Sequence, residues 1–578
     1  MTQSLFSRRL PGPWAARLTR IGLLPLAAYT ALSLLLFGTP LLAGGSRYVG
    51  TNDDPQIFIW GFGWMAHALA HGHNPLLTDA MWAPTGLNLA WVTTTPAIAF
   101  VFTPVTWVFG PVVAYNAAAI LMPATAAWTM FLLCRSITGR LWPSLFGGYL
   151  FGFSSYLVGH MVGELHLTSV FLLPLLTLVV VRYLRGDISA RALIGWAGVI
   201  LGAELYISTE IAFTATLAAI GALAIGYFTF PQARARVAAT AVRLVGAYVV
   251  GGLLASPMLY YALRDFRSSG YQPPEQFLAD VANLVIPTHF ALAGAGWAAH
   301  IAHHFPGNSS EQGSYLGLPL VAIGLLSIRA AIKSQTGRFL IACFALATVA
   351  SFGPHLTVAG HRVLPIPTPF GHDMLTIPGI GSKHVPLFDN SLPIRFSLFA
   401  SLAVAVAAAL WLARPNPNRA RHAFAIVAAV ALLPNIGAGV WSTRYSVPSF
   451  FTASAYKGCL GPDDIVLPLP IGFGGQATLW QAHDFGFRMA GGRVQTSPPT
   501  EFLHPASIAA ISVGYLPAPN QTALLRGYIK EKGVTAAFVD LRTASTWTPA
   551  LDAITVGHDV GGVRFYRLSG TPPGSCPA

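Results

Sequence analysis

Charged side chains are scarce in this 578-residue chain. Only 10% of its residues are Asp, Glu, Lys or Arg, whereas soluble domains contain about 25%, and 54% are hydrophobic. This composition, with a mean hydropathy of +0.57, excludes an ordinary soluble protein. The chain shows no internal repeat. No Walker or Rossmann motif precedes a helix where its phosphate-binding mechanism needs one, so the sequence offers no nucleotide site of those kinds.

The few basic residues form a ladder of clusters between apolar runs. Eighteen of the 34 Lys and Arg residues fall in six clusters, at 8–20, 135–140, 182–191, 234–243, 329–338 and 414–421. Because cytoplasmic loops of membrane proteins accumulate positive charge, these clusters mark the inner face. The net charge of +13 is therefore interpreted as a topology signal beside anionic lipid headgroups. No basic and aromatic patch supports a nucleic-acid partner.

The apolar runs predict a mostly α, polytopic membrane helix bundle of about 11 spans. A basic cytoplasmic N-terminus, 1–20, precedes a first span at 21–43 that is too long for a signal-peptide core. The run 96–109 is short for a span and is expected to dip in from outside. The other expected spans are 112–134, 142–158, 167–184, 192–209, 210–230, 243–262, 313–332, 338–356, 394–413 and 422–441. The bundle then occupies 21–442, with outer loops at 44–93, 263–312 and 357–393.

The tail, 443–578, differs from the rest of the chain. It contains a helical stretch at 522–531 and short strand-like runs at 464–469, 535–539 and 562–566. We expect a small extracytoplasmic α/β domain. Cys459 and Cys576 would then lie where disulfides are permitted, either bridged or as two free thiols. Cys134 and Cys343, within or beside spans, are interpreted as packing residues.

Titratable groups gather on the predicted outer side. Of 17 histidines only His422, and of 21 acidic residues only Asp187, are expected to face the cytoplasm. A transporter would be expected to place polar groups near the bilayer midplane and on both sides. The one-sided distribution favours an outward-facing active site that uses a substrate already delivered to that face.

Two adjacent acids, Asp53 and Asp54, follow the first span. Such a pair can supply a general base, bind a cation, or do both. Asp54 before Pro55 is also typical of an N-cap followed by proline at the first helical position.

The segment after this pair, 56–70, is predicted to be an amphipathic helix lying at the membrane interface. Trp60, Trp64, His67 and His71 recur on it at helical spacing, which suits contact with lipid headgroups. His67 and His71 stand one turn apart, so a metal site is the alternative interpretation.

The run DDPQIFIWGFGWMAHALAHGHNPLLTDAMWAPTGLNLAW, followed by FGPVVAYN, resembles the start of bacterial GT-C-type membrane glycosyltransferases, particularly an actinobacterial branch. Segments similar to that family and to YfhO-type membrane proteins are GHMVGELHLTSVFLLPLL (159–176), EQGSYLGLPL (311–320) and NSLPIRFSLFASLAV (390–404). The resemblance covers about 45–445. In GT-C enzymes an acid or an acid pair in the first outer loop is the catalytic base, and the matching residues here are Asp54 and its neighbour Asp53.

The resemblance implies an inverting enzyme of the plasma membrane. It would transfer a sugar from a polyprenyl-phosphate donor to a cell-envelope glycan or glycolipid on the outer face, with a divalent cation left open. Arg395, at the outer start of an apolar span, is expected to stabilise the departing phosphate, or else to be a snorkelling interfacial arginine. The alternative is a non-catalytic lipid or polysaccharide transporter, or an envelope-assembly protein, on the same scaffold.

The remaining substrate-binding candidates share a position at outer helix ends: His160, Glu164, His166, Glu204, Glu210, Glu311 and Tyr315. His160 and Glu164, one turn apart, would bind the sugar or a cation, or merely cap a turn. Glu204 and Glu210 flank a tight apolar hairpin. An ionisable residue in a span is a functional candidate by default, although both would be solvated if the turn fell at 205–210.

Overall fold

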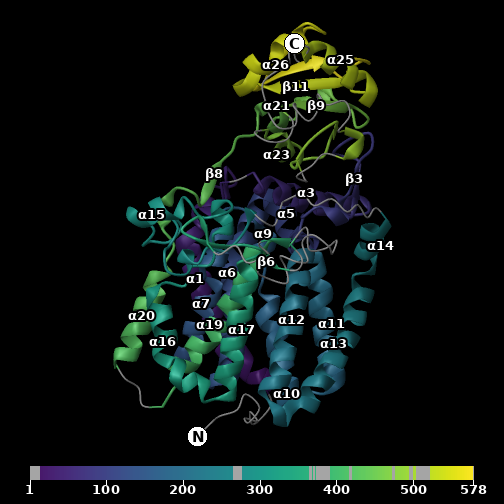
Figure 1. The fold of residues 1–578 in the computed structure, drawn as a ribbon. Helices are drawn as coiled ribbons and strands as arrows, with labels where there is room; N and C mark the ends of the chain where they lie inside the picture. The colour runs from purple at the N-terminus through teal and green to yellow at the C-terminus, as the bar shows by residue number, and fades with distance from the viewer. Residues whose placement is uncertain are drawn as a thin grey trace. The chain divides into compact units, whose positions relative to one another are not determined.

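The computed structural model describes residues 14–51, 53–264, 276–363, 367–368, 371–372, 391–415, 419–470, 475–493, 499–502 and 521–576. The chain forms two compact units (Figure 1). The first contains Met1–Thr39, Ala119–Ser256 and Arg267–Ser442, and the second contains Pro40–Ala118, Pro257–Phe266 and Thr443–Ala578. The predicted tail, 443–578, is thus grouped with two earlier segments, and its boundary as a separate domain stays a prediction.

Helices of very different lengths dominate the first unit. They are α1 (Trp14–Phe37), α6 (Pro111–Thr138, which begins in the second unit), α7 (Leu141–Gly152), α8 (Ser155–His160), α9 (Leu165–Thr168), α10 (Leu172–Arg185), α11 (Ala190–Ile207), α12 (Thr209–Thr229), α13 (Arg234–Leu254), α16 (Leu318–Ile332), α17 (Gln335–Ser351), α19 (Ser397–Leu412) and α20 (Arg419–Ala431). The short helices η5 (Ser309–Glu311) and η7 (Pro393–Phe396) position polar residues between them.

Within the described residues, six helical segments are long and apolar enough to cross a membrane. They are Pro111–Thr138, Leu165–Arg185, Ala190–Ile207, Thr209–Thr229, Pro231–Leu254 and Pro393–Leu412. Three shorter apolar helices, Gly22–Phe37, Leu318–Ile332 and Gln335–Ser351, accompany them. The architecture is that of a multi-pass membrane protein, and the expected count of about 11 spans is not confirmed.

Three predicted spans differ most from the observed helices. The span at 142–158 is broken into α7 and α8, because Ser154 leaves the helical conformation and its Oγ accepts a hydrogen bond from the N–H of Leu157. The span at 422–441 ends at Ala431, since Pro434 disfavours helix at the residue before it. The span at 243–262 starts earlier, and its helix, α13, ends at Leu254. The run 96–109, expected to dip in from outside and not to span, forms two short helices, α4 (Pro96–Val101) and α5 (Thr103–Phe109).

Glycines allow α11 and α13 to pack side by side (Figure 1). A Cβ on Gly198 would lie 2.6 Å from Val250, and one on Gly251 would lie 3.0 Å from the carbonyl oxygen of Gly198. Such small residues let helix backbones approach closely, which is how helices associate where no water is available to drive burial.

The second unit contains a five-stranded mixed sheet. Its order is β10 (Arg488–Met489), β9 (Ile465–Leu469), β11 (Ala536–Asp540), β13 (Val563–Arg567) and β12 (Gly557–Val560). The first three strands run parallel, and β13 runs antiparallel to both β11 and β12. Every residue of β9 and β11 is buried, as expected for parallel strands covered on both faces.

The helices of this unit include α3 (Pro55–His71), α14 (Ser256–Arg264, whose first residue belongs to the first unit), α23 (Ala477–Gln481), α25 (Gln521–Lys532) and α26 (Ala544–Asp552). The three predicted strands and the predicted helix at 522–531 are confirmed as β9, β11, β13 and α25. Cys459 and Cys576 form a disulfide, so the bridge is confirmed over the two free thiols. Cys134 and Cys343 are free.

Candidate functional site

Arg395 is the centre of a buried ionic cluster in the first unit. Its guanidinium forms an ion pair with Glu210 of α12, and its Nη2 lies 2.6 Å from Oε1 of Glu311 in η5. Its Nε donates a second hydrogen bond, of 3.2 Å, to the same Glu311 oxygen. Arg395 is only 9% exposed, so the snorkelling interpretation is wrong. A buried guanidinium is retained only where carboxylates offset its lost hydration.

His160, at the end of α8, extends this cluster. Its Nδ1 is hydrogen-bonded to a carboxylate oxygen of Glu164, one helical turn further on. Its Nε2 lies 3.9 Å from Oε2 of Glu311, and Ser310 Oγ lies 2.9 Å from Oε1 of Glu164. A continuous chain therefore runs Glu164, His160, Glu311, Arg395, Glu210. Five of the predicted substrate-binding residues meet here.

Glycine makes this convergence possible. α8 passes so close to η5 that a Cβ on Gly159 would lie 2.8 Å from the carbonyl oxygen of Ser310. Asn308 caps η5 by accepting a hydrogen bond from the N–H of Glu311, which fixes the backbone that carries this carboxylate. The close approach of backbones, more than any long side chain, brings Glu311 to His160.

Gly159→Ala should lower the free energy of unfolding by about 1–3 kcal/mol, the usual cost of overpacking. The contact that must yield is a backbone carbonyl, so η5 has to shift and carry Ser310 and Glu311 away from His160. Denaturant or thermal unfolding in detergent measures the change. The control is Gly195→Ala in α11, where a Cβ would meet nothing within 4 Å and alanine favours the helix. Equal stability of the two variants would contradict the close-approach argument.

The cluster is rich in negative charge. Burial raises the pKa of Glu164, but the hydrogen bond to His160 and the positive charge of Arg395 together outweigh it and hold that pKa well below its ordinary value. Ligand atoms of His160, Glu164 and Glu311 lie within 4.8 Å of one another. A divalent cation could use that spacing, and the same two carboxylates also contact Ser310 and Arg395.

Three other candidate residues, His166, Glu204 and Tyr315, also belong to the first unit. His166 is near enough to Arg395, Glu164 and His160 for an electrostatic interaction. Glu204 in α11 is buried, so the solvated interpretation is wrong, and within the described part of the chain its two carboxylate oxygens have no hydrogen-bond partner. Tyr315 is buried, and no described contact joins it to the cluster.

Sequence reasoning missed Tyr156. Its ring stands edge-on to that of His160, with the two ring centroids 4.4 Å apart. Its buried hydroxyl has no hydrogen-bond partner among the described residues. The only available signal was that Tyr156 precedes His160 by one helical turn.

The acidic pair of the second unit is held by an arginine from the distant tail. Nη1 of Arg493 lies 2.6 Å from Oδ2 of Asp53, and its Nη2 lies 3.4 Å from Oδ1 of Asp54. The arginine side chain is 7% exposed, whereas those of Asp53 and Asp54 are 38% and 32% exposed. The two aspartates are thus held by a buried arginine, while their own side chains remain partly open to solvent.

Asp54 occupies the N-cap position of α3 and Pro55 begins the helix, as predicted. However, the Asp54 side chain makes no capping hydrogen bond, so the purely structural interpretation of this carboxylate is not supported. Arg493 escaped sequence reasoning because 440 residues separate it from Asp53, and nothing in its local sequence marks it.

The interfacial interpretation of α3 is wrong for most of its length. Residues 55–66 are all buried. Trp60 donates a 2.8 Å hydrogen bond to Gln481 of α23 instead of facing headgroups, and Gln481 in turn donates to the carbonyl oxygens of Ala80 and Phe487. Only the last turn, with half-buried His67 and exposed His71, reaches solvent.

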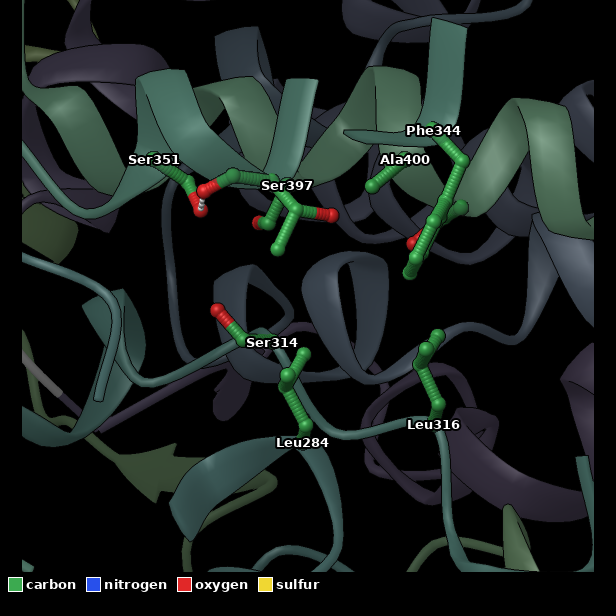
Figure 2. Close-up of a pocket in the computed structure, with 9 residues that line it drawn as sticks. Leu284, Ser314, Leu316, Phe344, Ser351, Ser397 and Ala400 are labelled. Carbon is green, nitrogen blue, oxygen red and sulfur yellow. Dashed lines mark hydrogen bonds between the residues drawn. The ribbon is translucent and has the colours of Figure 1, made fainter. Parts of the chain in front are cut away.

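A small cavity lies in the first unit. Two of the residues that line it, Ser314 and Ser397, are close in sequence to Glu311 and Arg395 of the ionic cluster. Figure 2 shows Ser314, Leu284 and Leu316 on one side of the cavity and Ser351, Ser397, Phe344 and Ala400 on the other. Its volume of about 10 Å³ holds about one water molecule. The hydroxyls of Ser314, Thr348 and Ser397, which line it, have no hydrogen-bond partner within the described residues. The cavity is too small for a sugar phosphate.

The fold defined by these elements is that of the GT-C membrane glycosyltransferases. The chain belongs to the family described as Domain of unknown function (DUF6311), whose model matches residues 26–378. No curated protein sequence matches it.

Two solved structures illustrate the likeness. The archaeal oligosaccharyltransferase AglB from Archaeoglobus fulgidus, in complex with an inhibitory peptide and a dolichol-phosphate, has a TM-score of 0.52 and 11% identity, over 96% of this chain and 75% of AglB. The arabinofuranosyltransferase AftD from Mycobacteria has a TM-score of 0.55 and 15% identity, over 94% of this chain and 40% of AftD. At such identities the likeness shows the fold alone. The resemblance to YfhO-type proteins stays a prediction.

Proposed function

We propose that this protein is a membrane glycosyltransferase that moves a sugar, with inversion, from a polyprenyl-phosphate donor to a cell-envelope glycan or glycolipid on the outer face of the plasma membrane. One observation carries the proposal. On a GT-C fold, directly after the first apolar helix, two solvent-open carboxylates are held in place by the buried Arg493. The solved complex of AglB contains a dolichol-phosphate, which supports a lipid-linked donor of the same general class.

Asp54 is the proposed general base. Its contact with Arg493 is longer than that of Asp53. Asp53 therefore forms the stronger ion pair with the guanidinium and orients the acidic pair. Asp54 would remove the proton of the acceptor hydroxyl as that oxygen attacks the anomeric carbon, and the bond from that carbon to the donor phosphate would break. Arg395 and the residues that contact it are proposed to stabilise the negative charge on the departing phosphate.

If Arg395 contacts the donor phosphate, Glu210→Gln and Arg395→Lys should have opposite effects. The glutamine weakens a carboxylate that competes for the guanidinium, so donor affinity should rise. The lysine keeps the charge but loses the forked geometry. One charged hydrogen bond is worth about 1.5–3 kcal/mol, so affinity should fall about tenfold or more. Binding of a fluorescent polyprenyl phosphate to purified protein measures both. Unchanged affinity in both variants would remove Arg395 from the donor site.

The reaction itself is tested by incubating the purified, detergent-solubilised protein with radiolabelled polyprenyl-phosphate sugars and a panel of envelope glycans and glycolipids. We expect label to appear in one acceptor and to require the lipid-linked form of the sugar. A nucleotide sugar should not replace it, because the sequence has no recognisable nucleotide-binding motif. Transfer from a nucleotide sugar in the absence of lipid donor would contradict the proposal.

A further inference from the structure

Three histidines gather at the C-terminal end of α3, in the second unit. His67 and His71 stand one helical turn apart, with ring centroids separated by 4.2 Å. Gly72 then adopts a left-handed conformation, with φ of 69°, that glycine reaches without strain. The N–H groups of Gly72 and His73 both bond to the carbonyl oxygen of Ala68. This turn brings the His73 ring to 5.9 Å from His67 and 6.0 Å from His71.

These spacings are close to those of a shared cation site, although the ring nitrogens do not yet converge as the ligand atoms of His160, Glu164 and Glu311 do. Imidazole nitrogens bind Zn²⁺ at about 2.0–2.1 Å in tetrahedral geometry, which places the centres of three ligating rings about 5 Å apart. The side chain of His73 is exposed, so its ring can turn toward the other two. The ring of His67 packs against those of Trp64 and Phe485, at centroid distances of 5.7 and 5.0 Å.

A backbone hydrogen bond prepares one of the ligands. Nδ1 of His71 lies 2.9 Å from the carbonyl oxygen of His67, an acceptor that requires the proton to be on Nδ1. The lone pair of Nε2 is then directed outward. Ligating histidines almost always donate their second N–H to a carbonyl or carboxylate in this way, because the bond fixes the tautomer and the orientation of the ring.

We propose that His67, His71 and His73 bind a borderline divalent cation of the zinc class through three imidazole nitrogens, with water at the open position. Imidazole ligands suit Zn²⁺, Cu²⁺ or Ni²⁺, whereas Mg²⁺ and Ca²⁺ prefer oxygen. The site lies at the opposite end of α3 from Asp54, about 25 Å away for a helix of 17 residues. It is thus separate from the acidic pair and does not depend on the proposed transferase reaction.

The test is Zn²⁺ binding by the full-length protein, purified in detergent without a polyhistidine tag, in competition with a chromophoric chelator. We expect a single site. His71→Gln, a change at an exposed side chain, should lower its affinity at least about 10-fold, since even outer-shell changes commonly cost that much. The triple glutamine variant should lose the site. Co²⁺ in place of Zn²⁺ should give the visible absorption of a tetrahedral, nitrogen-rich site in the wild type and not in the triple glutamine variant.

The chain supplies a matched control in the first unit. His300 and His304 have the same four-residue spacing, Nδ1 of His304 lies 3.0 Å from the carbonyl oxygen of His300, and their ring centroids are 5.7 Å apart, so this pair tests whether any two histidines of this kind account for the binding. The His300→Gln/His304→Gln variant should keep wild-type affinity. The proposal is overturned if the wild type fails to bind Zn²⁺, if the triple variant binds as the wild type does, or if the control variant loses the site.

Discussion

Asp54→Asn is expected to lower the rate of sugar transfer by about 10²–10⁴-fold, the contribution usually made by a positioned general base. Asparagine has the shape of aspartate and keeps an oxygen that can accept from Nη2 of Arg493, so the local structure should survive. What it loses is the ability to take the proton of the acceptor hydroxyl. The rate is measured with purified protein and the radiolabelled donor, at saturating acceptor, so that a defect in kcat is separated from one in binding.

Asp53→Asn is the matched variant. It removes the carboxylate that lies nearer to Arg493, so we expect a smaller loss of rate together with a loss of stability, because Arg493 is buried and depends on that charge. The folding of Asp54→Asn is checked by its elution as a monodisperse species and by an unchanged thermal midpoint. Full activity in both single variants and in the double variant would refute the assignment of this pair as catalytic.

Arg395→Met is expected to reduce the free energy of unfolding by about 3–5 kcal/mol, the usual cost of leaving buried charges without their partner. Methionine fills much of the space of the arginine stem, so the loss comes from charge. Without the guanidinium, the carboxylates of Glu311 (3% exposed) and Glu210 (19% exposed) lose the cation that pairs with both of them. The change is measured as the shift in denaturant or thermal unfolding of the purified protein in detergent.

Neutralising the partners should restore much of this stability. Arg395→Met combined with Glu210→Gln and Glu311→Gln removes the unpaired charges, and groups in one ionic network are strongly non-additive. We therefore expect the triple variant to be more stable than Arg395→Met alone. If the triple variant loses the sum of the separate effects, or if Arg395→Met costs less than about 1 kcal/mol, the cluster is not the coupled unit described.

The parts of the fold that follow local rules could be predicted from sequence. The apolar strands at 465–469 and 536–540 stand out because both faces of a parallel strand are buried, which requires an unbroken apolar run. His160 and Glu164 could be paired because a four-residue spacing brings side chains together over one turn, which here is the turn that leads from α8 to α9. Arg395 was conspicuous because an arginine at the start of an apolar span must find a partner or reach water.

Other features depend on distant contacts and could not be predicted in this way. Arg493 meets Asp53 only after the chain has folded, and sequence patterns carry no signal over 440 residues. The burial of Trp60 in α3 depends on Gln481, which is equally remote. The end of α20 at Ala431 is a different case, because Pro434 was visible in the sequence and should have shortened the expected span.

The central claim is that the acidic pair faces away from the cytoplasm, since a base on the inner side could not meet a donor presented outside. A cysteine at the exposed Thr51, beside the pair, tests this with a membrane-impermeant maleimide applied to intact cells. Asp187→Cys, in a basic loop, is the control for the opposite face. We predict that Thr51→Cys reacts in intact cells and Asp187→Cys only after permeabilisation. The reverse pattern would contradict the proposed site and its chemistry.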